Sequence, residues 1–253
     1  MTNFHTHTTF CDGKNTAEEM VVAAIEKGFS ALGFSSHSDM IVDFAAYTDE
    51  IARLKAKYAD KIRIFCGLEL ELAKPRPDYL PTDSHCPLSY LIGSHHFISA
   101  PDGAFFAIDN TAEELLGGIR DHFGNSPEAF VRAYYAELRS TLEMKFDIVG
   151  HPDLIRKFNR RIPWLNESAA WYREELALTA EAIAASAKLV EVNTGAISRG
   201  WLDDAYPSAE FRELLRERGV RFILSSDAHS TEGLDCAFDR YASAERYLAF
   251  SPS

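Results

Sequence analysis

Short apolar runs alternate with helical patterns along most of this 253-residue chain. Alternation of this kind predicts a parallel sheet, because each helix returns the chain to the end at which the next strand starts. Seven strands with helices between them fit a closed barrel better than an open sheet, so we expect an α/β barrel. The predicted strands cover residues 2–7, 31–36, 62–70, 90–95, 146–150, 189–193 and 220–226.

Capping residues indicate where several helices begin and end. Thr16 and Glu19 form a capping box before an apolar run, and Gly28 follows that run as a stop signal. Ser126 followed by Pro127 is typical of a helix start. Further helices are expected around residues 51–58, from Thr111 onwards, and over 168–187, 211–215 and 235–249, with an irregular proline-containing stretch at 75–87.

Composition and charge narrow the class of protein. The chain is 46% apolar and 25% charged, which is ordinary for a globular protein. Its net charge of −12 disfavours nucleic acid or an anionic membrane as partner, but not a small anionic substrate held by local arginines. We find no linker, signal pattern or membrane-spanning run, and the four cysteines are sparse. We therefore expect a single domain over residues 1–253 in the cytoplasm.

Metal-type residues begin almost at once, with His5, His7 and Asp12. Side chains two residues apart in a strand point the same way, so the two histidines can bind one cation. Imidazole together with carboxylate suits zinc, iron or manganese.

Similar residues follow nearly every other predicted strand. In an α/β barrel the carboxyl ends of the strands share one rim, which holds the active site. Such a set is too large for one tetrahedral ion, so we expect two or three ions. His85 and His122 fall in a loop and a helix and are not expected to be ligands. The rim residues are His37, Glu69, Glu71, His95, His96, His151, Asp153, Asp227 and His229.

The motifs His-x-His-x-x-x-x-Asp, Gly-x-Glu, Ser-x-His, Gly-His-x-Asp and Asp-x-His resemble the polymerase-and-histidinol-phosphatase (PHP) superfamily over the whole chain. Residues 150–158 and 191–195 resemble its histidinol-phosphatase branch. The resemblance implies a distorted seven-stranded TIM-like barrel that binds three metal ions. It implies one ion held by His5, His7, Glu69 and Asp227, a second bridged by Glu69 and held by His96 and His151, and a third held by Asp12, His37 and His229.

Two of these assignments have a competitor nearby. Glu71 points to the same side of its strand as Glu69, but Glu69 is the glutamate that fits Gly-x-Glu. His95 competes with His96, and the motif favours His96 because the family has a small or apolar residue at the first position. His95 is then expected behind the ligands.

The expected chemistry is hydrolysis of a phosphate monoester. Metal coordination lowers the pKa of bound water towards ~7 and makes it a nucleophile. Arg156 and Arg199 follow strands on the rim, and similar arginines in the histidinol-phosphatase branch contact the substrate phosphate. Lys157 is a neighbour that need not face the same way. His229 or Asp227 could assist departure of the leaving group.

The resemblance therefore predicts a histidinol-phosphatase, which hydrolyses L-histidinol phosphate to L-histidinol and phosphate in histidine biosynthesis. Two alternatives stay open at this point. One is a phosphodiesterase or exonuclease on the same scaffold, acting on nucleotides. The other is a barrel that binds metal without catalysis.

Overall fold

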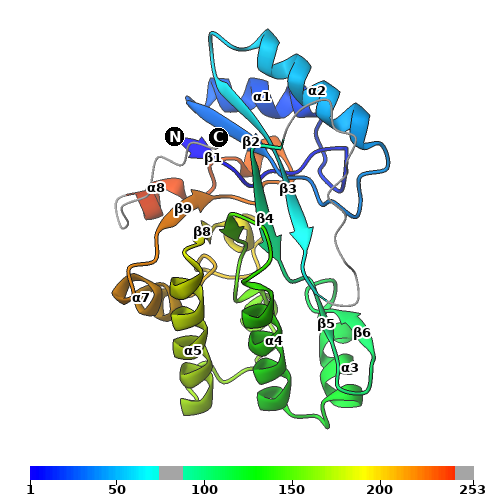
Figure 1. Cartoon of the computed structure of the whole chain (residues 1–253), viewed down its shortest axis with the longest axis vertical. Coiled ribbons are helices and arrows are strands. Elements are labelled where there is room, and N and C mark those ends of the chain that lie inside the picture. The colour runs from blue at the N-terminus through cyan, green and yellow to red at the C-terminus, as the bar shows by residue number, and fades with distance from the viewer. Residues whose placement is uncertain (74–87, 243–253) are drawn as a thin grey trace.

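The computed structural model describes residues 1–73 and 88–242. Seven parallel strands follow one another in the order β1-β2-β3-β4-β7-β8-β9 and form a nearly closed barrel, which confirms the predicted fold class (Figure 1). The predicted stretch 75–87, with His85, and the end of the last predicted helix lie outside the described residues. The strands are β1 (Thr2–Asn3), β2 (Ala31–Phe34), β3 (Arg63–Glu71), β4 (Tyr90–Ser94), β7 (Ile148–Val149), β8 (Leu189–Asn193) and β9 (Phe222–Ser225).

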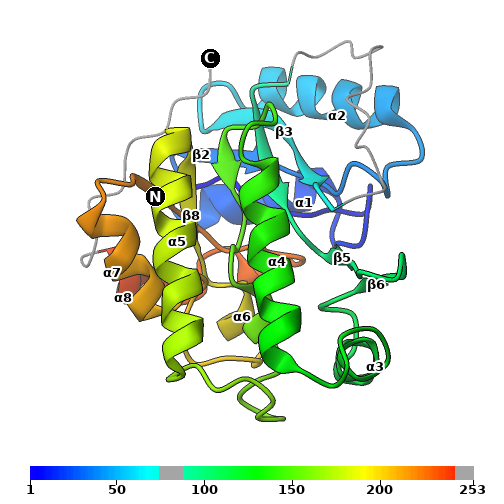
Figure 2. The same cartoon turned by 60° about the horizontal axis from the view of Figure 1, so that its bottom comes forward.

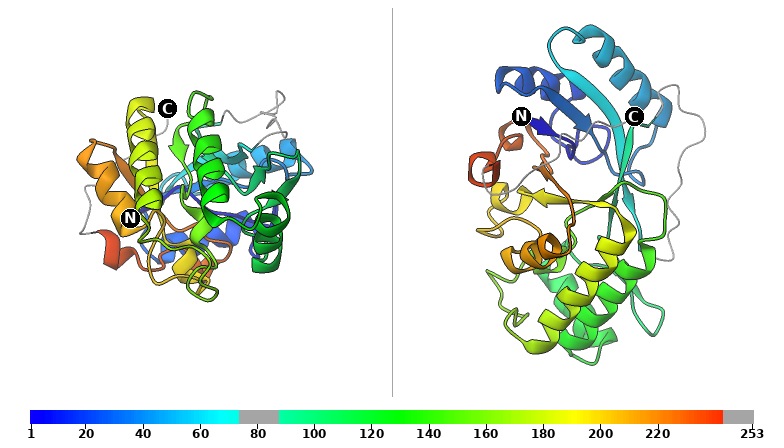
Figure 3. Two further views of the ribbon diagram at one scale, coloured as in Figure 1. Left: turned by 90° about the horizontal axis from the view of Figure 1, so that it is seen from below. Right: turned by 60° about the vertical axis from the view of Figure 1, so that its left-hand side comes forward.

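The helices lie outside the barrel strands. In Figure 1, α1 and α2 lie at one end beside β2 and β3, and α4 and α5 lie at the other end; Figure 2 shows α4 and α5 side by side. Both views in Figure 3 show α7 next to α5. None of the helices described is long and apolar enough to cross a bilayer. The helices are α1 (Ala17–Glu26), α2 (Phe44–Lys57), α3 (Ala112–His122), α4 (Pro127–Thr141), α5 (Ala170–Ser186), α6 (Gly195–Ser198), α7 (Ala209–Glu217) and α8 (Phe238–Ala242).

The capping signals mark helix starts as predicted. Thr16 and Glu19 form both hydrogen bonds of a capping box at α1, and Ser126 caps α4 ahead of Pro127. Thr111 caps α3, and this helix continues through two glycines, Gly117 and Gly118. One of these, Gly118, is required by packing, because a Cβ there would lie 2.2 Å from the Phe106 ring.

An antiparallel hairpin interrupts the strand–helix order and was not predicted. It consists of β5 (Phe97–Ser99) and β6 (Phe105–Ala107), joined by a turn that contains Pro101, Asp102 and Gly103. Three-residue strands are too short to show a pattern in sequence. The hairpin follows β4 directly and lies beside the carboxyl end of the barrel.

Tyr90 lies in a buried cluster of side chains contributed by the barrel strands, together with Phe4, Ile92, Ile148, Leu189 and Ile223. Its hydroxyl donates to the carbonyl oxygens of Phe4 and Phe34, at 2.6 and 3.0 Å. Glycines on two neighbouring strands leave room for the ring, because a Cβ on Gly33 or Gly67 would lie 2.4–2.5 Å from Tyr90 atoms. The interior is therefore a packed core and leaves the carboxyl rim as the place for chemistry.

The barrel closes along a seam between β1 and the residues after β9. Thr6 and Ala228 form a parallel bridge, and the N–H of His7 donates to the carbonyl of Ala228 at 2.9 Å. Deeper in the barrel, the Asn3 side chain donates to the Ser226 hydroxyl at 2.6 Å. This seam brings the first metal-type residues of the chain against the last.

Candidate metal centre

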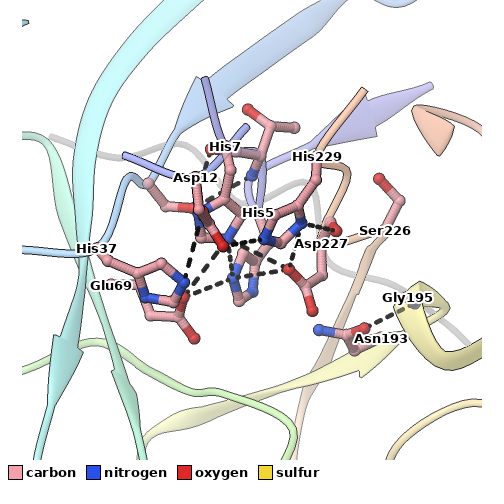
Figure 4. A network of polar contacts seen from close by, with 12 residues as sticks. His5, His7, Asp12, His37, Glu69, Asn193, Gly195, Ser226, Asp227 and His229 are labelled. Carbon is pink, nitrogen blue, oxygen red and sulfur yellow. Dashed lines mark hydrogen bonds and ion pairs between the residues drawn. The ribbon is translucent and has the colours of Figure 1, made fainter. Parts of the chain in front are cut away.

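Side chains of all nine predicted ligands meet at the carboxyl rim of the barrel (Figure 4 draws seven of them). The Nε2 atoms of His5 and His7 lie 3.1 Å apart at the end of β1. Glu69 Oε2 lies 3.2 Å from His5 Nε2, and Asp227 Oδ1 lies 3.2 Å from His7 Nε2. These four buried side chains form a first group of possible ligands.

A second group surrounds the other side of Glu69. Its Oε1 lies 2.9 Å from His151 Nε2 and 3.4 Å from His96 Nε2. Its Oε2 lies 3.1 Å from His37 Nδ1. Glu69 thus faces imidazoles from four other strand ends with its two oxygens, which is the position a bridging carboxylate needs.

A third group lies nearer to solvent. His229 Nε2 is 3.0 Å from Asp12 Oδ2, and His37 Nε2 is 3.9 Å from Asp12 Oδ1. The ring of His7 stacks on that of His229, with 4.1 Å between centroids. Asp12 is the exposed member of the set, with 42% of its side chain accessible.

Glu71 and His95 occupy different positions from their competitors. Glu71 accepts hydrogen bonds from the backbone N–H and from Nδ1 of His96, so it supports that histidine from behind. His95 points away from the rim, where its Nε2 lies 3.3 Å from the Thr141 hydroxyl and its ring packs against Tyr134. The geometry therefore favours Glu69 and His96 as ligands.

The donor set fits metal ions. Glu69 Oε2 is fully buried and has no hydrogen-bond partner, although three imidazole nitrogens lie within 3.5 Å. Burial raises the pKa of Glu69, but the surrounding histidines hold it well below its usual range. Burial, with His229 and His37, lowers the pKa of His7 to about 3. Glu69 and His7 are thus in the charged and neutral forms in which such groups bind metal. Nearby carboxylates outweigh burial and raise the pKa of His5, so this ring would release a proton on binding.

A cavity of about 210 Å³ lies over the centre and includes two basic residues in its wall, Arg199 and Lys157. Arg199 Nη2 donates to Asp227 Oδ2 at 2.7 Å, and its Nη1 lies 3.2 Å from His229 Nδ1. Burial lowers the pKa of Arg199, but the nearby Asp227 carboxylate raises it by more. The net pKa is above its usual value, so the guanidinium stays charged.

Arg156 lies differently from its neighbour Lys157. Its Nε donates to Glu167 at 2.6 Å and its Nη1 to Asp153 at 3.3 Å, and the side chain is not part of the wall of the 210 Å³ cavity. Lys157 reaches that wall, where it donates to the carbonyl and carboxylate of Asp109. The short 3-10 helix Leu154–Arg156 turns the two neighbours in different directions.

Two acidic residues at the site were missed in the sequence. Glu191 is fully buried in β8 and lies 2.8 Å from His5 Nδ1. A charged residue within an apolar strand was the signal that could have drawn attention to it. Asp109, in the loop after β6, lines the cavity together with Lys157, and no spacing signal marked it.

The chain belongs to the PHP domain family, whose model matches residues 3–195. It is 29% identical over 252 residues to a Schizosaccharomyces pombe protein named "Probable histidinol-phosphatase", covering 89% of this chain and 79% of that one. It is 26% identical to the histidinol-phosphatase of Lactococcus lactis, covering 90% and 82%.

A solved structure of the Lactococcus lactis histidinol phosphate phosphatase, in complex with zinc, L-histidinol and phosphate, has the same fold. Its TM-score is 0.73 at 20% identity, covering 99% of this chain and 96% of that one.

Proposed function

We propose that this protein is a metal-dependent histidinol-phosphatase that hydrolyses L-histidinol phosphate to L-histidinol and phosphate. The observation that carries the proposal is the convergence of nine metal-type side chains on a cavity whose wall also holds Arg199 and Lys157. Relatives named histidinol-phosphatase that align over most of both chains support the choice of substrate.

The nine side chains would hold three ions of zinc, manganese or iron. Following the motifs, we assign His5, His7, Glu69 and Asp227 to one ion, Glu69, His96 and His151 to the second, and Asp12, His37 and His229 to the third. The ligand atoms that lie within reach of one another form overlapping groups, which are His5, His7 and Glu69; His5, His151 and Asp227; His37, Glu69 and His96; and His7, Asp12, His37 and His229. Bound ions would activate water and neutralise charge on the phosphate. Glu69 faces both of the first two groups and is our candidate for the bridging ligand.

Phosphate would be held between the metal groups and the basic residues in the cavity wall. Arg199 is charged, lines the cavity, and lies on the side of Asp227 and His229. A guanidinium can give two parallel hydrogen bonds to equatorial phosphate oxygens. Arg156 was predicted for the same task; bound to Asp153 and Glu167, it would need to exchange those partners to reach phosphate.

The leaving group needs a proton as it departs. His229 lines the cavity and has its Nδ1 near the Asp227 carbonyl, at 2.9 Å. Asp227 is held as a carboxylate by Arg199. Of the two predicted candidates, we therefore propose His229 for this role; because its Nε2 faces Asp12 and would bind the third ion, the proton would be the one on Nδ1.

The cationic part of the substrate would occupy a second cavity beside the first. This cavity of about 420 Å³ shares Asp12, His37, His96, Asp109 and Lys157 with the first. Carboxylates of Asp39, Glu71 and Glu114 also line it. A third cavity, on the Arg199 side, includes Lys14 and Glu232 instead. An amine and an imidazole are attracted to the more acidic of the two.

The alternatives lose support from the same features. A nucleotide brings additional negative charge, which the acidic second cavity opposes. A barrel that binds metal without catalysis has no need for charged donors in an open cavity beside the ligands. Neither alternative is favoured by the relatives of this chain.

Steady-state kinetics after metal reconstitution test the proposal. Histidinol phosphate is compared with a nucleotide phosphodiester and with p-nitrophenyl phosphate, a monoester without a cation. We expect the highest kcat/KM for histidinol phosphate. Preference for the phosphodiester, or no turnover of any monoester by protein loaded with metal, would overturn it.

The position of the substrate cation is tested by Asp39→Asn, because Asp39 lines the second cavity but not the first, with Glu232→Gln in the third cavity as the matched control. Asp39→Asn should raise KM for histidinol phosphate more than for p-nitrophenyl phosphate. Glu232→Gln should leave this ratio unchanged. The reverse pattern would place the cation on the Arg199 side.

A further inference from the structure

Glu191 lies in β8, which is the one strand of the barrel that contributes none of the nine predicted ligands. Its neighbours in the strand, Val190 and Val192, are fully buried and pack in the hydrophobic core, while Glu191 is equally buried with a carboxylate. A buried charge persists only where it is well hydrogen-bonded or paired. The partners of Glu191 therefore indicate what the residue does.

Four groups surround the Glu191 carboxylate. Oε2 lies 2.8 Å from His5 Nδ1 and also accepts a hydrogen bond from the Ser225 hydroxyl. Oε1 accepts hydrogen bonds from the backbone N–H of His151 and from the Asn193 side chain, both at 2.8 Å. These partners come from the ends of four different strands, so Glu191 connects one side of the rim beneath the metal-type side chains.

The contact with His5 selects one of its two ring nitrogens for the metal. A carboxylate accepts only, so Nδ1 must carry the hydrogen in this pair. The lone pair available to a metal is then on Nε2. This nitrogen lies 3.2 Å from Glu69 Oε2 and 3.7 Å from Asp227 Oδ1. The ring is thereby held with its ligand atom pointing into the first group.

The contact with His151 acts on the backbone instead. Gly150 precedes this residue and packs so closely on Ser94 that a Cβ would lie 2.1 Å from the Ser94 hydroxyl. With the His151 N–H bonded to Glu191, the chain leaves β7 in one direction, which places His151 Nε2 2.9 Å from Glu69 Oε1. One carboxylate thus orients a histidine from each of the first two groups.

We infer that Glu191 is a positioning residue of the metal centre, which fixes the tautomer and orientation of His5 and the backbone that presents His151. Partners behind metal-bound histidines commonly raise metal affinity 10–100-fold. Asn193 and Ser225 in turn hold the carboxylate in place; Figure 4 shows Asn193 at the end of β8, below Asp227. The inference rests on the proposed metal centre but not on the identity of the substrate.

Glu191→Gln tests this role, because the amide keeps the shape but lacks the charge and one acceptor. The matched control is Glu175→Gln on α5, a buried glutamate that pairs with Arg132 and Arg139 away from the centre. Zinc affinity is measured by competition with a chelator, without substrate. The His5 Nδ1–H is followed by ¹H–¹⁵N NMR in the zinc-loaded protein, and the melting temperature of the metal-free protein reports on folding.

We expect Glu191→Gln to bind zinc 10–100-fold more weakly than wild type and to lose or shift the His5 Nδ1–H signal. Glu175→Gln should change only the melting temperature. Zinc affinity within threefold of wild type for Glu191→Gln, or an equal loss for Glu175→Gln, would overturn the inference. If Glu191→Gln does not fold, Glu191→Asp is measured instead, because it keeps the charge on a shorter side chain. An unchanged zinc affinity and an unchanged His5 Nδ1–H signal in this variant would also overturn the inference.

Discussion

Glu71 holds His96 by two atoms at once, accepting from its backbone N–H at 2.9 Å and from its ring Nδ1 at 3.1 Å. The ring is thereby turned so that Nε2 faces Glu69 at 3.4 Å. Glu69 and Glu71 leave β3 on the same side, yet one lies among the imidazoles and the other behind one of them. The two glutamates should therefore respond differently to the same substitution.

Glu69→Gln should lose most of the bound metal and nearly all turnover, because an anionic oxygen facing two groups of ligands is removed. Glu71→Gln should retain its metals when they are supplied in excess, since Glu71 lies behind His96 and the amide oxygen can still accept one hydrogen bond; a weaker affinity, as expected for Glu191→Gln, is compatible with this role. Metal content by mass spectrometry and kcat on histidinol phosphate measure both effects. The opposite pattern would mean that the bridging position belongs to Glu71.

The number of ions is a separate prediction. Protein loaded under mild conditions should approach three ions per chain, with the weakest site expected at the half-exposed Asp12. Removal of the ions with a chelator should abolish activity and lower the melting temperature, because the folded state alone offers the complete site; a ligand at 100 times its Kd contributes about 2.7 kcal/mol. A fully active sample with one ion per chain would contradict this prediction.

Arg199→Ala should lower kcat/KM on histidinol phosphate. The lost transition-state stabilisation calculated from the ratio of kcat/KM values should be about 2–4 kcal/mol, by analogy with the loss of one preorganised donor. Arg199→Lys should restore it only in part, because lysine cannot give two parallel hydrogen bonds. Metal content is measured in both variants, since Arg199 also contacts Asp227.

Arg156→Ala provides the comparison within the same prediction. If Arg156 also holds phosphate, its removal should lower kcat/KM as strongly as that of Arg199. If it serves only Asp153 and Glu167, the melting temperature should fall and kcat/KM should change little. Near-normal kcat/KM in both alanine variants would show that neither arginine binds phosphate.

Stability should fall at alkaline pH through Tyr241. Burial, together with its hydrogen bond to Asp204, raises the pKa of Tyr241 to about 12. An unfolded tyrosine ionises near pH 10. Between about pH 10 and 12 the unfolded chain therefore releases a proton that the folded protein keeps, and the free energy of unfolding decreases as pH rises.

Denaturant unfolding of wild type and Tyr241→Phe at pH 8, 10 and 11 measures this contribution. Above pH 10, the free energy of unfolding should fall more steeply for wild type than for Tyr241→Phe. Below pH 10, the difference in free energy of unfolding between the two proteins should be constant. Other buried tyrosines lower the free energy of unfolding at high pH equally in both proteins. The contribution of Tyr241 is therefore the difference between the two pH curves. Parallel curves over this pH range would contradict the prediction.

Much of the fold could be predicted because its signals are local. Short apolar runs alternating with helical patterns marked most of the barrel strands, and Thr16, Thr111 and Ser126 marked helix starts. Histidines and carboxylates at strand ends indicated the rim, since parallel strands place their carboxyl ends together. The structure brings all nine of these side chains into one region.

The features that could not be predicted depend on the direction in which side chains point and on contacts between residues far apart in the sequence. Arg156 and Lys157 are adjacent in sequence, and only the turn after β7 separates their environments. The role of Glu191 arises from the closeness of β8 to the residues that follow β1 across the barrel, which no spacing within a strand reveals. The β5–β6 hairpin is built from strands too short for periodicity.

The seam that closes the barrel also sets the order in which the centre can be assembled. Asn3 and Ser226, which bond across it, stand 223 residues apart in the chain. Contacts between such distant residues form late, because the intervening chain must first become compact. A growing polypeptide thus exposes His5 and His7 first and cannot complete their surroundings until residue 229 has been made. Full metal occupancy in a cell would therefore mark molecules that have finished both synthesis and closure.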